Sequence, residues 1–211
     1  MTCVIFCGGR IADYSYIKKY VGDASLIISA DSGAHHCRAL GIVPDLLVGD
    51  FDSVSSDDFC ALEKAGAKAV RFPAEKDMTD SELAVEIAID RGCSRIILLG
   101  AIGSRLDHSV SNLFLLKKLH DANVDGIIAD EKNEVRLISD YITLRREDDV
   151  FVTLLPINGT ATGVTTRGLY YPLDNAVLAA GSSRGVSNRF SEEEAYVEVK
   201  NGCLLVVVSR D

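Results

Sequence analysis

Two acidic residues follow a short apolar run in the stretch LLVGDFDSV, residues 46–54. The run LLV is typical of a buried strand, and Asp50 and Asp52 come just after Gly49. Carboxylates at the end of a core strand add little packing, so a role in chemistry has to be considered. A few hard oxygen ligands, with positions left open for water and phosphate, are what a magnesium ion prefers. Gly49 allows a close approach, so both acids can point at one ion.

Polar residues follow three further apolar runs in the same way. Asp31, Ser32 and Gly33 follow LIIS; Lys76, Asp77, Thr79 and Asp80 follow AVRF; and Gly100, Gly103, Arg105 and Asp107 follow RIILLG. In an open parallel sheet the carboxyl ends of the strands meet at one edge, where ligands collect. Four consecutive strand ends with acids, small residues and cations therefore predict one site.

Magnesium–phosphate chemistry suits this edge. Asp80 or Asp77 can approach the ion of Asp50 and Asp52 from the next strand, while Lys76 and Arg105 can take up charge on a leaving group. Glycine-rich turns and helix N-termini offer backbone N–H groups to phosphate oxygens. The chain has no GxxxxGK[ST] motif, and neither CGGR nor GAIGSR matches GxGxxG, so neither a P-loop nor a dinucleotide fingerprint is present.

Each of these residues can also be explained by a structural role alone. Thr79 with Glu82, and Ser104 with Asp107, fit helix-capping boxes, and Ser32 fits a simple cap. Asp50 and Asp52 fit a solvated turn. The four histidines show no metal-ligand spacing, which favours structural or surface roles; they are His35, His36, His108 and His120. Capping alone does not explain why all these residues gather at one edge.

The elements that must position this edge can be read from apolar patterns up to about residue 130. Six runs are expected to be strands: CVIF, LIIS, LLV, AVRF, RIILLG and GIIAD. Two helical stripes lie between them, one of Leu83, Ala84, Ile87 and Ala88 and one of Leu106, Val110, Leu113 and Phe114. This alternation predicts an α/β domain with a parallel sheet covered on both faces, over residues 1–135.

The pattern changes after about residue 140 and predicts a small antiparallel β-sandwich over residues 136–211. Asn158-Gly159 and Asn201-Gly202 are each typical of a two-residue hairpin. Apolar residues alternate with polar ones along 195–200, as in a strand with one buried face. A β domain of this size is close to the limit for a lone core, so we expect it to pack on the first domain or on a second subunit.

Composition bounds the protein class. The 211 residues carry a net charge of −9 with 47% hydrophobic residues, which fits a globular protein and argues against a nucleic-acid binder. The N-terminal stretch does not resemble a signal peptide, and no apolar run approaches the roughly 20 residues that cross a bilayer. Six scattered cysteines without a CxxC motif are expected to be reduced core thiols of a cytoplasmic protein.

Five blocks of the chain together resemble one enzyme family. In order they are ADSGAHH, PDLLVGDFDSV, KDMTDSELA, GSRLDHSVSN and GSSRGVSN. Their sequence and spacing resemble thiamine pyrophosphokinase of the bacterial type across nearly the whole chain. The resemblance implies transfer of a diphosphate from ATP to the hydroxyl of thiamine, giving thiamine diphosphate and AMP. It also implies a nucleotide-binding α/β domain, a β-sandwich, and a homodimer that holds thiamine between one subunit's catalytic domain and the other's β domain.

The resemblance further implies a role for each matched residue. The expected magnesium ligands are Asp50, Asp52 and Asp80, and these three with Arg105 and Asp107 are the expected catalytic residues. The residues expected to bind the nucleotide are Asp31, Ser32, Gly33, Lys76, Asp77, Thr79, Arg105, Asp107 and Asn112. Those expected to bind the thiamine pyrimidine are Ser182, Ser183, Ser187 and Asn188. Animal members carry a tryptophan near thiamine, whereas this chain has none. Phe190 or Tyr196 is the expected substitute.

The expected reaction is in-line attack of the thiamine hydroxyl on the β-phosphorus of ATP, with AMP as the leaving group. An aspartate of the cluster, for which we favour Asp80, accepts the hydroxyl proton. Two other functions share the acidic edge: a magnesium-dependent nucleotide phosphohydrolase, and a sensor that binds nucleotide or thiamine without turnover. The polar Ser/Asn block in the second domain indicates a second substrate and disfavours the hydrolase. A sensor can lose an acid, and this chain keeps all of them.

Overall fold

The computed structural model describes residues 1–211 and divides into two compact units, unit 1 (Met1–Glu131) and unit 2 (Lys132–Asp211). The sequence alone suggested a division after residue 135. The α/β character of the first unit and the β character of the second are as predicted. No helix is both long and apolar enough to cross a membrane.

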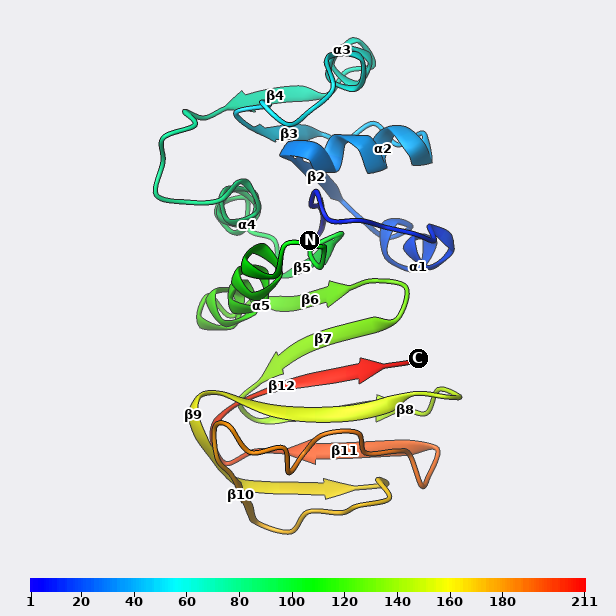
Figure 1. Ribbon diagram of the computed structural model, residues 1–211, viewed down its shortest axis with the longest axis vertical. Coiled ribbons are helices and arrows are strands. Elements are labelled where there is room, and N and C mark those ends of the chain that lie inside the picture. The colour runs from blue at the N-terminus through cyan, green and yellow to red at the C-terminus, as the bar shows by residue number, and fades with distance from the viewer. The chain divides into compact units, whose positions relative to one another are not determined.

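Unit 1 is built on a parallel sheet of six strands (Figure 1). The strands are β1 (Thr2–Phe6), β2 (Leu26–Ala30), β3 (Leu46–Gly49), β4 (Lys68–Arg71), β5 (Arg95–Leu99) and β6 (Asp125–Ala129). Their order is β4-β3-β2-β1-β5-β6, and every neighbouring pair is parallel. The order reverses between β1 and β5, which is the point of an open sheet where ligands bind. All six strands had been predicted.

Helices cover both sides of this sheet, with α4 and α5 on one side and α1 and α2 on the other (Figure 1). The helical segments are η1 (Ser15–Ile17), α1 (Lys18–Val21), η2 (Asp31–Gly33), α2 (Ala34–Leu40), α3 (Ser56–Lys64), α4 (Asp80–Asp90) and α5 (Leu106–Asp121). Buried strand residues such as Phe6, Leu47 and Leu99 form a core with Ala34 and Cys37 of α2. The predicted stripe of α4 is confirmed, since Leu83, Ala84 and Ala88 are buried.

The predicted stripe of α5 is wrong. Leu106, Val110 and Phe114 are 75%, 41% and 52% exposed. The buried face carries two polar residues, Ser109 and Asn112, beside a run of leucines. Their side chains bond to the loop after β5, so the helix turns a partly polar face inward.

Unit 2 contains six antiparallel strands: β7 (Asn133–Ile138), β8 (Tyr141–Arg145), β9 (Phe151–Arg167), β10 (Ala176–Leu178), β11 (Glu194–Glu198) and β12 (Asn201–Ser209). The first part of β9 pairs with β12, which also pairs with β7. The later part of β9 pairs with β10 and β11, and β11 pairs with β8. The long strand β9 is thus part of both layers of the sandwich. The core between the layers contains residues such as Leu154, Val164, Val197 and Leu204. The β-sandwich prediction is confirmed, as is the buried face of β11.

Neither predicted hairpin is present. Asn158 and Gly159 have φ angles of 66° and 113° but lie inside β9. Opposite them, Cys203 pairs with Ile157 and Asn201 with Thr162, so residues 158–161 bulge past Gly202. Asn-Gly supplies the left-handed backbone that a bulge needs as readily as a two-residue turn does. Asn201-Gly202 begins β12, which pairs with β7 and β9 and not with the preceding β11.

All six cysteines are free. Four of them are buried in unit 1 as predicted, and burial raises the pKa of the Cys7 thiol to about 11. Cys60 on α3 is exposed and Cys203 on β12 is half-buried, so these two are not core thiols.

Candidate active site

A pocket of about 780 Å³ lies at the carboxyl edge of the unit 1 sheet. The segments after β2, β3, β4 and β5 all line it, so the structure brings the four predicted strand ends together. The segment Cys7–Ile11 after β1 lines it as well. Sequence reasoning missed this fifth segment because CGGR was tested only as a dinucleotide motif.

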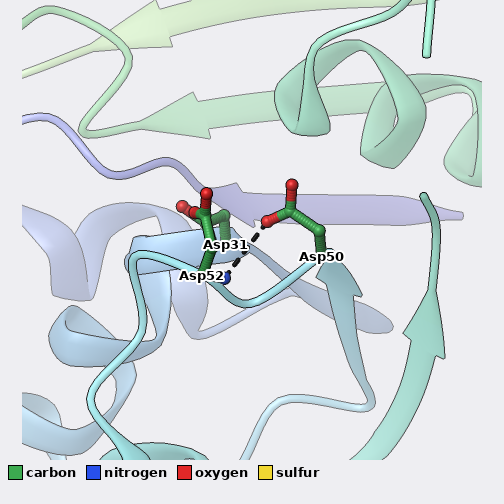
Figure 2. A group of neighbouring side chains, drawn as sticks. All are labelled: Asp31, Asp50 and Asp52. Atoms are coloured by element: carbon green, nitrogen blue, oxygen red, sulfur yellow. Dashed lines mark hydrogen bonds between the residues drawn. The ribbon is translucent and has the colours of Figure 1, made fainter. Parts of the chain in front are cut away.

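Three carboxylates form the acidic part of this edge. Asp31, Asp50 and Asp52 each bring one oxygen to within 4.8 Å of the others, from the ends of β2 and β3 (Figure 2). The backbone N–H of Asp52 donates to Asp50 Oδ1 at 3.1 Å, which closes the turn between them. Asp31 was predicted as a nucleotide residue; its place at the end of the strand next to β3 was the signal that it joins this cluster.

Asp80 lies at the same pocket but is paired with a lysine. Lys76 Nζ is 2.9 Å from Asp80 Oδ1 and 3.9 Å from Asp50 Oδ2. Asp80 is the first residue of α4, where Thr79 is the N-cap and accepts from the Glu82 N–H at 3.2 Å. The predicted Thr79 cap is therefore real, and it fixes the direction in which Asp80 enters the pocket.

Gly49 brings these acids close together. Its φ angle is 149°, and a Cβ at this position would lie 3.3 Å from both Asp31 Cβ and Asp80 Oδ1. A larger residue would be strained and crowded here, so glycine lets the ends of β2 and β3 and the start of α4 meet.

The surroundings of Asp31 disfavour the charged form of its carboxyl group. Burial raises the pKa of its carboxyl; a bond from the Ser32 N–H opposes the rise, and the negative charges of Asp80, Asp50 and Asp52 add to it. Its Oδ1 is buried without a hydrogen-bond partner. A buried carboxylate oxygen that lacks a donor and faces other carboxylates fits a divalent cation, because a cation would supply the missing partner and neutralise the cluster.

The loop after β5 forms another wall of the pocket. Asn112 donates from Nδ2 to the Ala101 carbonyl at 2.8 Å, and Ser109 Oγ accepts from the Gly103 N–H at 3.0 Å. The predicted Asn112 thus lines the pocket while its amide holds the loop. The predicted Ser104 cap is absent, since the N-cap of α5 is Arg105 without a side-chain bond.

Arg105 and Asp107 form an exposed ion pair at this loop. Arg105 Nη2 is 2.6 Å from Asp107 Oδ2, and the bonded guanidinium lowers the pKa of Asp107 to about 2. Arg105 lines the pocket and Asp107 does not. Asp52, Asp77 and Gly33 also lie outside the lining, although Asp52 stays close to Asp50 and Asp31. Ser32 is part of the lining and caps no helix.

His36 holds the first loop of the pocket. Its Nε2 lies 2.7 Å from the Gly9 carbonyl, which can only accept, so Nε2 carries the proton and Nδ1 accepts from the Tyr14 hydroxyl at 2.9 Å. Burial lowers the pKa of His36, which favours this neutral form. His36 has a structural role and His35 is exposed, in line with the structural or surface roles expected for the histidines. Both also line the pocket, as does His108.

In unit 2, the predicted thiamine residues lie on the exposed segment before β11. Ser182, Ser183 and Ser187 are exposed. Asn188 is buried: its Oδ1 accepts from the Tyr171 N–H at 3.0 Å, and its Nδ2 donates to the Tyr171 carbonyl at 2.8 Å. The amide of Asn188 therefore holds the backbone of Tyr171, an exposed residue.

The two aromatic residues expected to replace tryptophan lie differently. Phe190 packs against the core of unit 2. Tyr196 is half-buried and stacks on Tyr141, with ring centroids 5.8 Å apart. Tyr170, Tyr171 and Tyr141 are the most exposed aromatic residues of unit 2, at 66%, 64% and 61%, and sequence reasoning did not single them out.

Comparison with known proteins matches both units. The family described as "Thiamin pyrophosphokinase, catalytic domain" matches residues 17–128, and the family described as "Thiamin pyrophosphokinase, vitamin B1 binding domain" matches residues 141–204. The chain is 28% identical to the thiamine pyrophosphokinase of Bacillus subtilis (strain 168), over 100% of this chain and 99% of the relative.

Solved structures give the same result. The crystal structure of thiamine pyrophosphokinase from Bacillus subtilis superposes with a TM-score of 0.91 at 26% identity, covering 100% of both chains. That of thiamin pyrophosphokinase from Geobacillus thermodenitrificans has a TM-score of 0.87 at 29% identity, covering 100% of this chain and 98% of the other.

Proposed function

Because the chain belongs to the thiamin pyrophosphokinase family, we infer that it transfers a diphosphate group from ATP to the hydroxyl of thiamine, giving thiamine diphosphate and AMP. The observation that carries this proposal is the pocket of unit 1, which extends across the switch point between β1 and β5 and is lined by carboxylates such as Asp31 and Asp50 together with the cationic Lys76 and Arg105. Such a site suits phosphoryl transfer, in which catalysis is mainly positioning and charge neutralisation.

We propose Mg²⁺ as the metal, held by Asp50 and Asp52 with Asp31 and Asp80 beside them. The buried Asp31 Oδ1 without a partner, and the all-oxygen donor set, support this assignment. When bound, the ion supplies positive charge that makes the acidic pocket acceptable to a triphosphate. Asp31 would thereby join the predicted set of Asp50, Asp52 and Asp80.

The remaining pocket residues are proposed to bind and orient ATP. Lys76 can turn from Asp80 to a phosphate oxygen, and Arg105 presents its guanidinium from the opposite loop. Ser32 lies where the chain enters α2, and Asn112 and His36 keep the loops after β5 and β1 in place. Thr79 also lines the pocket, beside Asp80. Gly33 and Asp77, which lie outside the lining, would then act through the local backbone, and Asp107 would act through Arg105.

The thiamine hydroxyl attacks the β-phosphorus in line, the bond to the α-phosphate oxygen breaks, and AMP leaves. We assign the hydroxyl proton to the Asp80 carboxylate, which pairs with Lys76 at 2.9 Å in the absence of ligand and is freed when Lys76 turns to a phosphate oxygen. Proton transfer of this kind contributes about 10²–10⁴-fold to a rate.

Thiamine is proposed to bind through unit 2. Ser182, Ser183 and Ser187 offer exposed hydroxyls, while Asn188 fixes the backbone next to them. Following the family resemblance, we propose a homodimer in which thiamine lies between the catalytic unit of one subunit and the β unit of its partner. Free cysteines suit a reducing compartment, so we propose that the enzyme works in the cytoplasm.

Phosphorus NMR of the purified protein with ATP and magnesium, with and without thiamine, tests the function. We expect AMP and thiamine diphosphate to appear only when thiamine is present. ADP and free phosphate formed regardless of thiamine would identify a nucleotide hydrolase instead. Binding of both ligands without any turnover would identify a sensor.

A further inference from the structure

The turn that carries Asp50 and Asp52 is strained at the residue between them. Phe51 has a φ angle of 65°, in the left-handed region that a bulky L-residue rarely adopts. Strained backbone persists only where the surroundings fix it, and it gathers at functional sites. Something outside the turn must therefore hold Phe51.

The Phe51 side chain is held from two other elements. Its ring packs on Phe59 of α3 with centroids 4.8 Å apart, and the Arg71 guanidinium lies 4.9 Å from the centroid of each ring. Arg71 ends β4, where it pairs in register with Gly49 of β3. Both rings also pack against the core of unit 1. The turn is thus anchored to α3, β4 and the core through one side chain.

The anchored residue lies between two carboxylates that would otherwise move apart. Asp50, Asp52 and Asp31 bring oxygens to within 4.8 Å of one another, and like charges at this spacing repel (Figure 2). The hydrogen bond from the Asp52 N–H to Asp50 Oδ1 is local to the turn and cannot fix its place relative to β2. The contacts of Phe51 with Phe59 and Arg71, which we call the Phe51 clamp, reach outside the turn and can fix its place.

We propose that Phe51 is a positioning residue: the Phe51 clamp holds Asp50 and Asp52 in the arrangement that binds the metal–nucleotide complex. This inference rests on the proposed function of the acidic cluster. Phe51 has no atom that could bind a metal and is not among the residues that line the pocket, so it acts through the two aspartates. Removing a group that orients metal ligands typically weakens metal binding by about 10–100-fold.

The variant Phe51→Gly distinguishes a positioning role of the Phe51 side chain from a role in core packing alone. Glycine adopts a φ of 65° without steric cost, so Phe51→Gly removes the clamp and relieves the strain together. If the backbone alone positioned the acids, this variant would bind as well as the original chain. Phe51→Leu keeps an apolar side chain in the same place and serves as the conservative variant.

The test is the affinity of the full chain for Mn²⁺ with α,β-methylene-ATP, an analogue that cannot release AMP. The electron paramagnetic resonance signal of free Mn²⁺ gives the bound fraction without any turnover. We expect Phe51→Gly to bind about tenfold more weakly and Phe51→Leu to recover most of the loss. Thermal unfolding of each variant reports its stability.

Phe151→Ala is the matched control. Phe151 is also a half-buried phenylalanine under an arginine, with Arg189 at 5.1 Å from its ring centroid, but it belongs to unit 2. We expect it to lower stability without weakening Mn²⁺ binding. Equal losses of affinity in Phe51→Gly and Phe151→Ala would overturn the proposal, because general destabilisation would explain both.

Asp52→Asn separates failure of this inference from failure of the metal assignment. If Asp52→Asn binds the Mn²⁺ complex weakly while Phe51→Gly and Phe51→Leu bind it normally, only the positioning role is wrong. If Asp52→Asn itself binds normally, the acidic cluster does not hold the metal, and both proposals are wrong.

Discussion

Lys76 Nζ lies 2.9 Å from Asp80 Oδ1, so an ammonium group already neutralises one carboxylate of the pocket before any ligand binds. The same nitrogen is 3.9 Å from Asp50 Oδ2. Lys76 therefore offsets part of the repulsion among the acids, and it is a cationic side chain that lines the pocket next to them.

Lys76→Met should lower kcat/KM by about 10²-fold, because a charge aimed at the transferring phosphate would be lost. Lys76→Arg keeps the charge and should retain more activity. The rate of AMP formation at several ATP concentrations measures this. A Lys76→Met enzyme with unchanged kcat/KM would show that Lys76 serves only to pair with Asp80.

Asp52→Asn should cost activity far more than stability. The Asp52 side chain is exposed, and its Oδ1 accepts a hydrogen bond from the hydroxyl of the neighbouring Ser53, so little packing is lost. We expect turnover to fall by at least about 10²-fold while the unfolding transition moves little. A variant that unfolds readily, but whose folded fraction turns over normally, would contradict the metal assignment.

Asp31→Asn should stabilise the metal-free protein at neutral pH. Burial and neighbouring charges raise the pKa of Asp31 in the folded chain above its unfolded value, so ionising it costs stability as the pH rises through that window. The Asp31→Asn variant should therefore have the larger free energy of unfolding at any pH above the raised pKa of the folded chain. The difference should vanish below the pKa of the unfolded chain, which is about 4. Thermal unfolding in a chelator between pH 3 and 8 measures it, and added Mg²⁺ with ATP should reverse the order of the two proteins.

An equal stability of the Asp31→Asn variant and the original chain at pH 7 would show that Asp31 is not strained by its neighbours. Asp45→Asn is a suitable control for the loss of one negative charge elsewhere in unit 1. The Asp45 carboxylate accepts from the Ile27 N–H at 2.8 Å, and the asparagine oxygen can accept the same bond without the charge, so this substitution should not stabilise the protein.

The parts of the fold that the sequence predicts well are those where one physical rule acts alone. Strands buried on both faces are continuous apolar runs, and all six of unit 1 were recognised. The strand ends could then be placed at one edge by topology, which brought Asp50, Lys76 and Arg105 to one pocket.

The errors arise where two rules compete. In α5 the apolar Leu106, Val110 and Phe114 suggested a buried stripe, but the loop after β5 needs hydrogen-bond partners, and Ser109 and Asn112 take the inner face. At Asn158-Gly159 the left-handed backbone was read as a turn, whereas pairing with β12 continues past it as a bulge. Only long-range contacts decide between these outcomes.

Asn112→Ala should weaken folding and ATP binding together. Its buried amide donates to the Ala101 carbonyl at 2.8 Å, and leaving that carbonyl without a partner costs about 1–3 kcal/mol. The loop that carries Arg105 should loosen, which raises the KM for ATP. Urea unfolding and steady-state kinetics measure both effects; a raised KM with unchanged stability would instead place Asn112 in direct contact with the nucleotide.

The exposed serines and the buried Asn188 of unit 2 should respond differently to alanine substitution. Ser187→Ala removes an exposed hydroxyl, so it should raise the KM for thiamine and leave the KM for ATP and the stability nearly unchanged. Asn188→Ala breaks the bonds to Tyr171 N–H and carbonyl, so it should also destabilise unit 2, by about 1–3 kcal/mol. Thiamine titrations and urea unfolding together separate the effect on thiamine binding from the effect on stability.

If Ser182→Ala, Ser183→Ala and Ser187→Ala all leave the KM for thiamine unchanged, this segment does not bind thiamine. The exposed Tyr170 and Tyr171 then become the next residues of unit 2 to substitute.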